Sequence, residues 1–196
     1  MSEWTAETAE WYAEHYGEYA TNRLAVDALH IPTDATIIDV GCGTGSALRR
    51  VASRAPDATL IGIDPVPRML EIARERAARH PEGSRISFRE GFAEELPVAD
   101  GEADVIFSFD SFDHWRNQAE GLSEIRRALR RTGRLIMVKD ANLPDSNDAD
   151  ANVVDKLREA GFDVLARETL AEGDVACTMW SCGLTGDATG GWAAAS

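Results

Sequence analysis

The sequence predicts a three-layer α/β domain, in which helices cover both faces of a seven-stranded, mostly parallel β-sheet. Strand-like and helix-like segments alternate five times between residues 36 and 138. Segment 104–109 is almost continuously apolar, as is typical of a central parallel strand. A turn with three glycines follows the first expected strand, at the edge of the sheet where such folds bind ligands.

The first 30 residues predict a helical cap of one or two helices. They are rich in Ala and Glu, and Pro32 and Thr33 then interrupt the helical pattern. Tyr12, Tyr16 and Tyr19 fall on one face of a helix in this cap. Two explanations fit these tyrosines: they pack the cap against the sheet, or they form a flap over a ligand.

The core begins at residue 35 with a strand, a turn and a helix. Residues 36–40 (TIIDV) predict a short buried strand, and a helix is expected over 46–54. Residues 58–63 (ATLIGI) predict the second strand. The helix expected over 66–79 carries its apolar residues on one side and stops at the Pro and Gly of segment 80–83.

The second half of the core continues the alternation. Strands are expected at 86–89 and 104–109, and apolar residues at helical spacing predict a helix over 118–130. Thr132 and Gly133 end that helix, and the fifth strand is expected at 134–138.

The C-terminal part predicts two further strands. Residues 140–150 are polar and rich in aspartate, which predicts a flexible loop, followed by a short helix to about residue 160. Strands are expected near 163–169 and 175–184. Residues 186–196 are low in complexity and are expected to be disordered.

Size and composition favour a single domain. With 196 residues, of which 44% are hydrophobic, the chain can bury one core, which we expect over residues 1–185 (cap 1–30, Rossmann-like core 35–185). No apolar run approaches the roughly 18 residues that span a bilayer. The acidic N-terminal segment does not resemble a secretory signal. We therefore expect a cytoplasmic protein that does not associate with membranes, as a monomer or homodimer.

Charge and cysteine content disfavour other classes of function. The net charge of −14 disfavours binding to a nucleic acid backbone. The five arginines between residues 126 and 134 are expected to surround a solvated helix end. Three cysteines without metal-type spacing are expected to be reduced thiols, with Cys177 and Cys182 on opposite faces of one strand.

The glycine turn discriminates between two classes of cofactor. Dinucleotide-binding turns follow the pattern G-x-G-x-x-G, but the last glycine of that pattern is Ser46 here. Asp39, two residues before Gly41, would place negative charge close to a pyrophosphate. An acid at this position suits a ligand with a cationic part instead.

Five segments, in order, resemble the motifs of class I S-adenosylmethionine-dependent methyltransferases. Residues 39–45 (DVGCGTG) are similar to the family's D-x-G-x-G-x-G. The other four segments are GIDP with the following PRMLEIAR, then GFAEELP, FSFDSFDHW and LRRTGRLI. The resemblance covers about residues 37–138 and implies S-adenosylmethionine as cofactor and S-adenosylhomocysteine as product.

The resemblance also implies which residues bind the cofactor. Asp64 would accept hydrogen bonds from the ribose hydroxyls, although it could instead serve only as a helix N-cap. The carbonyl of Gly41 would receive the ammonium group, with Asp39 in electrostatic support. The other expected cofactor-binding residues are Cys42, Gly43, Thr44, Gly45, Pro65, Phe92, Ala93, Ser108, Phe109 and Tyr16. Phe92 replaces the acid that contacts adenine in many relatives, so stacking and the backbone amide of Ala93 are expected to replace that contact.

His114 and Asp110 are the candidate catalytic residues, because they follow the fourth strand, near the expected sulfonium. Asp110, Asp113 and His114 are residue types that could bind a metal, but no metal is expected. The predicted function is methyl transfer by in-line displacement to a small-molecule acceptor. A non-catalytic S-adenosylmethionine-binding protein and an NAD(P)-binding oxidoreductase are the alternatives.

Overall fold

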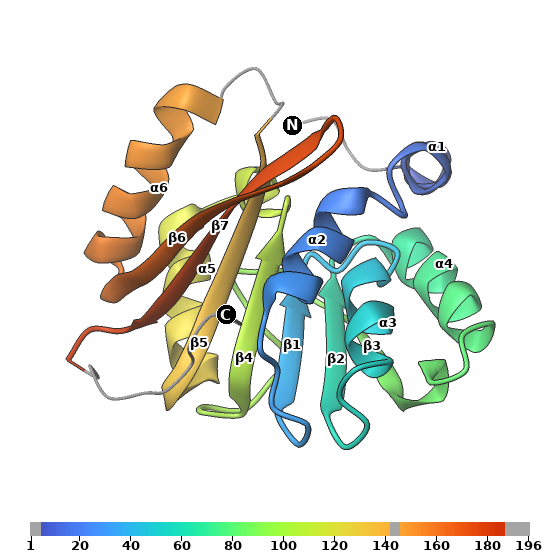
Figure 1. Cartoon of the computed structure of the whole chain (residues 1–196). Coiled ribbons are helices and arrows are strands. Elements are labelled where there is room, and N and C mark those ends of the chain that lie inside the picture. The colour runs from blue at the N-terminus through green and yellow to red at the C-terminus, as the bar shows by residue number, and fades with distance from the viewer. Residues whose placement is uncertain (1–4, 142–145, 187–196) are drawn as a thin grey trace.

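The computed structural model describes residues 5–141 and 146–186, which form a seven-stranded sheet with helices on both faces (Figure 1). The strand order is β3-β2-β1-β4-β5-β7-β6; β7 runs antiparallel to β5 and β6, and the other neighbouring strands are parallel. The strands are β1 Thr36–Val40, β2 Thr59–Asp64, β3 Ile86–Glu90, β4 Ala103–Phe109, β5 Leu129–Asp140, β6 Phe162–Glu172 and β7 Val175–Leu184. The predicted fold class is confirmed.

The helices divide between the two faces of the sheet. They are α1 Ala6–His15, α2 Ala20–Ala28, α3 Ser46–Ala52, α4 Pro67–Ala78, α5 Gln118–Ala128 and α6 Ser146–Glu159, with short 3-10 turns η1 Gly83–Arg85 and η2 Phe112–His114. One core cluster joins α2, α3 and α4 to the sheet, and the other joins α5 and α6 to its opposite face. Alternating residues of β1 enter the two clusters, Ile37 the first and Ile38 the second.

The order in which the chain adds strands to the sheet reverses at β1. The chain winds from β1 outward through β2 to β3, then returns to place β4 on the other side of β1. A gap therefore opens between the connections that leave the carboxyl ends of β1 and β4, which is where α/β sheets bind ligands.

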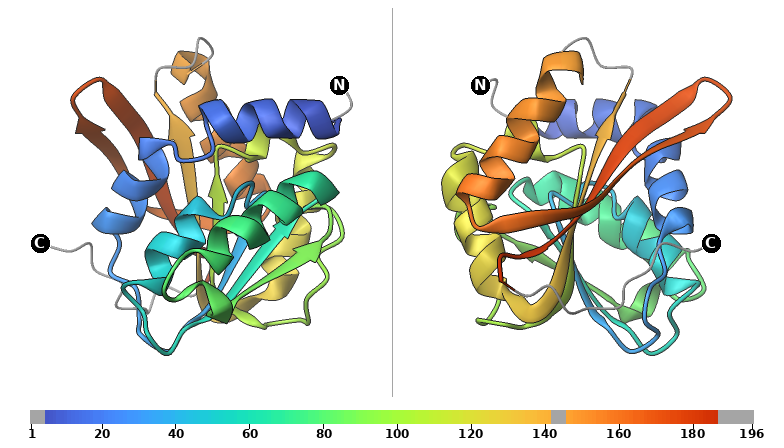
Figure 2. Two further views of the ribbon diagram at one scale, coloured as in Figure 1. Left: turned by 90° about the vertical axis from the view of Figure 1, so that its right-hand side faces the viewer. Right: turned by 60° about the vertical axis from the view of Figure 1, so that its left-hand side comes forward.

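The N-terminal cap closes over this edge. Helix α1 packs on α4 through a small cluster of Ala9, Ala13, Met69 and Ile72. Helix α2 lies against α3 and the β6–β7 hairpin, and the two views of Figure 2 show α1 and α2 meeting beside the sheet. Of the one or two helices expected for the cap, the structure shows two.

Three expectations about the C-terminal half were wrong. Strand β5 begins at Leu129 and ends at Asp140, longer at both ends than predicted. Helix α6 begins at Ser146, inside the predicted loop; residues 142–145 lie outside the described part. Arg134 is buried within β5, where its guanidinium donates to the carbonyls of Thr132 (3.1 Å) and Gly133 (3.0 Å), instead of lying at a solvated helix end. The tail predicted to be disordered lies outside the description from residue 187 on.

The cysteine prediction is confirmed. All three thiols are buried and unbonded, with Cys177 in one core cluster and Cys182 in the other. Within residues 5–141 and 146–186, no helix is both long and apolar enough to cross a membrane.

Candidate active site

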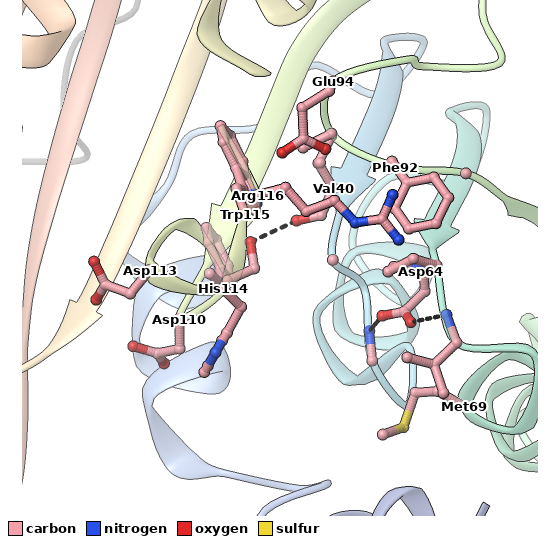
Figure 3. A pocket seen from close by; sticks show the side chains of 18 of the residues that line it. Val40, Asp64, Met69, Phe92, Glu94, Asp110, Asp113, His114, Trp115 and Arg116 are labelled. Atoms are coloured by element: carbon pink, nitrogen blue, oxygen red, sulfur yellow. Dashed lines mark hydrogen bonds between the residues drawn. The ribbon is translucent and has the colours of Figure 1, made fainter. Parts of the chain in front are cut away.

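A cavity of about 780 Å³ lies at the carboxyl edge of the sheet (Figure 3). Its walls come from the ends of β1, β2 and β4, the segment after β3, the 3-10 turn η2 and the first helix of the cap. Elements from both sides of the topological reversal thus contribute to one pocket. Its size falls within the range of small-molecule sites.

The glycine turn forms the floor of this cavity. Gly41, Gly43 and Gly45 have positive φ angles of 75°, 51° and 72°. A Cβ atom on Gly41 would lie 2.4 Å from the Cβ of Ser111, whereas one on Gly43 would meet nothing within 4 Å. The turn is therefore tight at Gly41 and open to the cavity at Gly43, so that a ligand can approach the bare backbone there.

Asp64 joins the tip of β2 to the glycine turn. Its carboxylate accepts hydrogen bonds from the backbone N–H groups of Gly43 and Val66, both at 2.9 Å (Figure 3). Burial raises the pKa of Asp64 to about 6, against the lowering effect of these two bonds. The bond from Val66 is the kind expected if Asp64 served as a helix N-cap. The carboxylate also lines the cavity, however, and has further lone pairs that can accept from a ligand hydroxyl.

Asp39 lies beneath the turn and is almost fully buried. No described residue donates to its Oδ1. Burial, and secondarily the carboxylate of Asp64, raise its pKa to about 7. An acid left without a partner directly before Val40 and Gly41, which line the cavity, fits a ligand that carries a positive charge.

The wall after β3 contains Phe92, Ala93 and Glu94. The guanidinium of Arg116 lies over the Phe92 ring, 3.8 Å from the centroid (Figure 3). One face of the ring expected to stack on adenine therefore carries an arginine.

The wall at β4 is held by two serines. Ser111 donates to the carbonyl of Val40 (2.7 Å), and its hydroxyl lies 3.1 Å from that of Ser108. Ser108 is fully buried behind this pair and is not part of the lining, whereas Phe109 is. The serines tie the tips of β4 and β1 together, which fixes the width of the cavity between them.

Asp110 and His114 both line the cavity, as Figure 3 shows. Burial raises the pKa of Asp110 to about 6, although hydrogen bonds from Asp140 and Thr21 lower it. Asp113 forms an ion pair with Lys139 at 2.7 Å. No group of three or more metal-ligating side chains suited to a metal ion occurs among the described residues.

The structure brings most of the predicted site residues together. Asp64, Pro65, Gly41, Gly43, Phe92, Ala93, Phe109, Asp110 and His114 line the cavity. Cys42, Thr44, Gly45 and Ser108 lie behind the lining, as does Asp39, and Tyr16 is 44% exposed outside it.

Sequence reasoning missed several lining residues. Tyr12 takes the place in the lining that was expected for Tyr16, whose ring centroid lies 5.4 Å away. Burial, then Asp110 and Asp64, raise the pKa of Tyr12, so it presents a neutral phenol to the cavity. The helical face shared by the tyrosines was the available signal, but which one points inward depends on how α1 docks. The others are Thr5, Val40, Val66, Pro67, Met69, Gly91, Glu94, Ser111, Trp115 and Arg116.

Comparison with known proteins agrees with this geometry. A model of the methyltransferase domain family matches residues 38–137, about half of the chain. The chain belongs to the class I S-adenosylmethionine-dependent methyltransferase family. The matched segment of this methyltransferase runs from β1 to β5 and contains the glycine turn, Asp64 and the β4 wall.

Two curated methyltransferases illustrate the relationship. Demethylmenaquinone methyltransferase of Deinococcus radiodurans is 34% identical over 103 residues, which cover 53% of this chain and 42% of the relative. The 27-O-demethylrifamycin SV methyltransferase of Amycolatopsis mediterranei is 30% identical over 152 residues, covering 78% and 55%. The chain thus spans about half the length of the curated relatives it matches.

A solved structure extends the fold comparison to nearly the whole methyltransferase chain. The crystal structure of a SAM-dependent methyltransferase from Aquifex aeolicus matches with a TM-score of 0.77 at 16% identity. The match covers 92% of this chain and 98% of that one. At this level of identity, the match supports the fold alone.

Proposed function

We propose that this methyltransferase binds S-adenosylmethionine in the cavity and transfers its methyl group to a small-molecule acceptor. The observation that carries the proposal is the open backbone at Gly43 beside the buried carboxylate of Asp64, both at the cavity surface. A bare turn and a nearby acid are what a nucleoside with an attached amino acid requires. The unpartnered oxygen of Asp39 supports a cationic ligand.

Each part of the site has a proposed role. Asp64 accepts hydrogen bonds from the ribose hydroxyls while its bonds from Gly43 and Val66 hold it in place. The turn at Gly41 receives the ammonium end, and Asp39 stabilises that charge from below. Phe92 and Ala93 contact the adenine side, where Arg116 extends the wall.

The chain contributes positioning more than chemical activation. The cofactor supplies an already reactive sulfonium methyl group when it is bound. Alignment of the two reactants can lower the barrier by several kcal/mol, up to roughly 7–11 in favourable cases. The walls formed by Tyr12, Phe109 and Trp115 exclude water, and His114 accepts a proton if the acceptor must lose one.

The acceptor is proposed to be a neutral or cationic small molecule. The two curated relatives are named for a quinone and a rifamycin, both small molecules. Four acids line the cavity, Asp64, Glu94, Asp110 and Asp113, against one arginine, which disfavours polyanions such as nucleic acids. We further propose that cap and core act as one domain over residues 1–185, since α1 supplies part of the lining.

Titration with S-adenosylhomocysteine by calorimetry tests the proposal, because an oxidoreductase would not bind it. We expect Asp64→Ala to weaken binding by more than about tenfold, since a hydrogen-bonded charged group contributes roughly 1.5–3 kcal/mol. Asp57→Ala, which removes an exposed acid just before β2, serves as the matched control and should leave affinity unchanged. Equal affinity of Asp64→Ala and the parent chain would refute the ribose assignment.

A non-catalytic S-adenosylmethionine-binding protein is the second candidate. The comparisons do not favour it over an enzyme, and the position of Arg116 over Phe92 bears on how adenine would be held in either case. Mass spectrometry of ligand that co-purifies with the chain, followed by a screen of methyl acceptors, distinguishes the two. Binding without turnover on any acceptor would support the second candidate.

A further inference from the structure

Asp110 has an unusual backbone for its residue type. It directly follows β4 and has a φ angle of 51°, the only positive φ among the described residues other than glycine. Its own N–H donates to the carbonyl of Val138 at 2.9 Å, which holds the bend against the end of β5. A left-handed aspartate costs conformational energy, so its side chain is expected to repay the strain through specific contacts.

Those contacts reach two other elements. Oδ1 of Asp110 accepts from the backbone N–H of Asp140, at the end of β5, at 2.7 Å. Oδ2 accepts from the hydroxyl of Thr21, in the first turn of α2, at 3.1 Å. One carboxylate thus joins the carboxyl edge of the sheet to the N-terminal cap, across 89 residues of sequence.

A second bond runs beside the first. Tyr19, which precedes α2, donates its hydroxyl to Oδ2 of Asp140 at 2.6 Å. The start of α2 is therefore fastened at Tyr19 and Thr21 to two neighbouring acids at the tips of β4 and β5. We name these four residues, Tyr19, Thr21, Asp110 and Asp140, the cap latch.

The other flank of the cap is fastened independently. The hydroxyl of Thr44, in the glycine turn, donates to the carbonyl of Gly17, and Glu18 forms ion pairs with Arg49 and Arg76. The link between α1 and α2 is consequently fixed from both sides. Helix α1, which carries Tyr12 into the cavity lining, leads directly into this link.

We propose that Asp110 is a positioning residue, which uses the cap latch to hold the N-terminal helices over the part of the cavity between Tyr12 and the β4 wall, where the acceptor would bind. The proposal rests on the proposed function and deepens it by assigning a positioning role to a residue that the sequence predicts to be catalytic. Both carboxylate oxygens already accept hydrogen bonds from the chain, which suits fastening better than proton transfer. Closure by the latch would fix the distance between Tyr12 and the β4 wall, and with it acceptor affinity.

Two substitutions at one position separate the two roles. In Asp110→Asn the amide oxygen can still accept from Asp140, and the amide nitrogen can donate to the hydroxyl of Thr21. In Asp110→Gly both contacts are lost while the backbone strain is relieved. A positioning role predicts that Asn preserves the parent behaviour and Gly does not, whereas a base would be lost equally in both.

Hydrogen exchange of α2, followed by mass spectrometry, is the direct readout. We expect Asp110→Gly and Thr21→Val to raise amide exchange of residues 20–28 by about tenfold, because each removes a bond to a charged group. Asp110→Asn should stay within about threefold of the parent chain. Arg23→Ala is the matched control: it removes an exposed ion pair from the same helix to Glu172 and should have little effect.

Kinetics on an acceptor found by the methyl-transfer screen complete the test. Asp110→Gly and Thr21→Val should raise the acceptor KM by about tenfold with a smaller change in kcat, and Asp110→Asn should restore both. Unchanged exchange of α2 in both disrupting variants, or equal loss of kcat in Asn and Gly, would overturn the proposal. Failure of the parent chain to bind S-adenosylhomocysteine would instead refute the proposed function and leave the exchange result standing.

Discussion

Asp39 is a residue at which folding and the proposed ligand binding would make opposite demands. Its carboxyl is buried, one oxygen has no partner among the described residues, and burial raises its pKa to about 7 from an ordinary value near 3.8. Between about pH 4 and pH 7 the folded state therefore keeps a proton on Asp39 that the unfolded chain has released. The contribution of this protonated carboxyl to stability is fully present below about pH 4 and is lost as the pH rises through 7.

Asp39→Asn should remove this pH dependence, because an amide cannot ionise. The difference in free energy of unfolding, variant minus parent chain, is expected to increase by up to about 4 kcal/mol from pH 4 to pH 8. This follows from 1.36 kcal/mol for each unit by which the pKa is raised. Urea denaturation at a series of pH values measures the difference. Asp57→Asn removes the same formal charge from an exposed position and is the control.

The same variant should bind S-adenosylhomocysteine more weakly, since the charge that costs stability would serve the ammonium group. A parallel loss of affinity and gain of stability is the expected pattern at a functional site. If Asp39→Asn is more stable than the parent chain and binds S-adenosylhomocysteine equally well, the proposed electrostatic role of Asp39 is refuted. The cost of burying its charge would still be supported.

At the scale of elements, the glycine turn can be tested against another turn of the same backbone geometry. Gly43 and Gly173, the latter between β6 and β7, have φ angles of 51° and 59°, and a Cβ on either would meet nothing within 4 Å. Alanine should cost each turn a similar 1–2 kcal/mol through the left-handed backbone alone. Only at Gly43 does the added methyl project beside the cavity.

Gly43→Ala should therefore weaken S-adenosylhomocysteine binding by about tenfold or more, while Gly173→Ala should not, although the two lose similar stability. Calorimetric titration gives the affinities, and urea denaturation checks the stabilities. Equal affinities in the two variants would mean that no ligand approaches the turn at Gly43.

The elements that sequence predicted well are those with local signals. The first, second and last strands were placed to within one residue at each end, because apolar runs bounded by turn residues define them. The first half of β5 was not predicted, because LRRTG resembles the end of a helix. It becomes a strand only because Leu129 pairs with Ala103 of β4. The helix before β6 was predicted, but its start at Ser146 was not, because the first turn of α6 is rich in aspartate.

The site shows the same division. Gly41, Gly43 and Asp64 are adjacent to recognisable strand ends, so local sequence was enough to place them. Tyr12 lies in the cavity only because α1 docks on α4, and Thr21 meets Asp110 only because the cap folds back over β4. Contacts between segments far apart in the sequence leave no local sequence pattern. The position of Asp110 after the fourth strand therefore suggests catalysis when the sequence is read alone.

At the scale of the whole molecule, net charge sets how stability responds to salt. The chain carries 34 acids against 20 lysines and arginines, a formal charge of −14. Its ion pairs are mostly exposed, such as Arg50 with Asp27 and Arg130 with Asp104, and such pairs contribute about 0–1 kcal/mol each. Repulsion among the excess acids is therefore expected to outweigh what the pairs contribute.

Salt should stabilise the folded chain at pH 8. Raising the ionic strength from 0.01 M to 0.1 M shortens the screening length from about 30 Å to about 10 Å, which weakens long-range repulsion more than short ion pairs. We expect the free energy of unfolding to increase by roughly 1 kcal/mol, measured in urea because guanidinium is itself a salt. The same titration near pH 4.6, where the sequence has no net charge, isolates the ion pairs, and salt should there have no effect or destabilise. Destabilisation by salt at pH 8 would contradict this expectation. It would show that the surface ion pairs, including those of Glu18 that hold the cap, stabilise the fold by more than the repulsion between acids destabilises it.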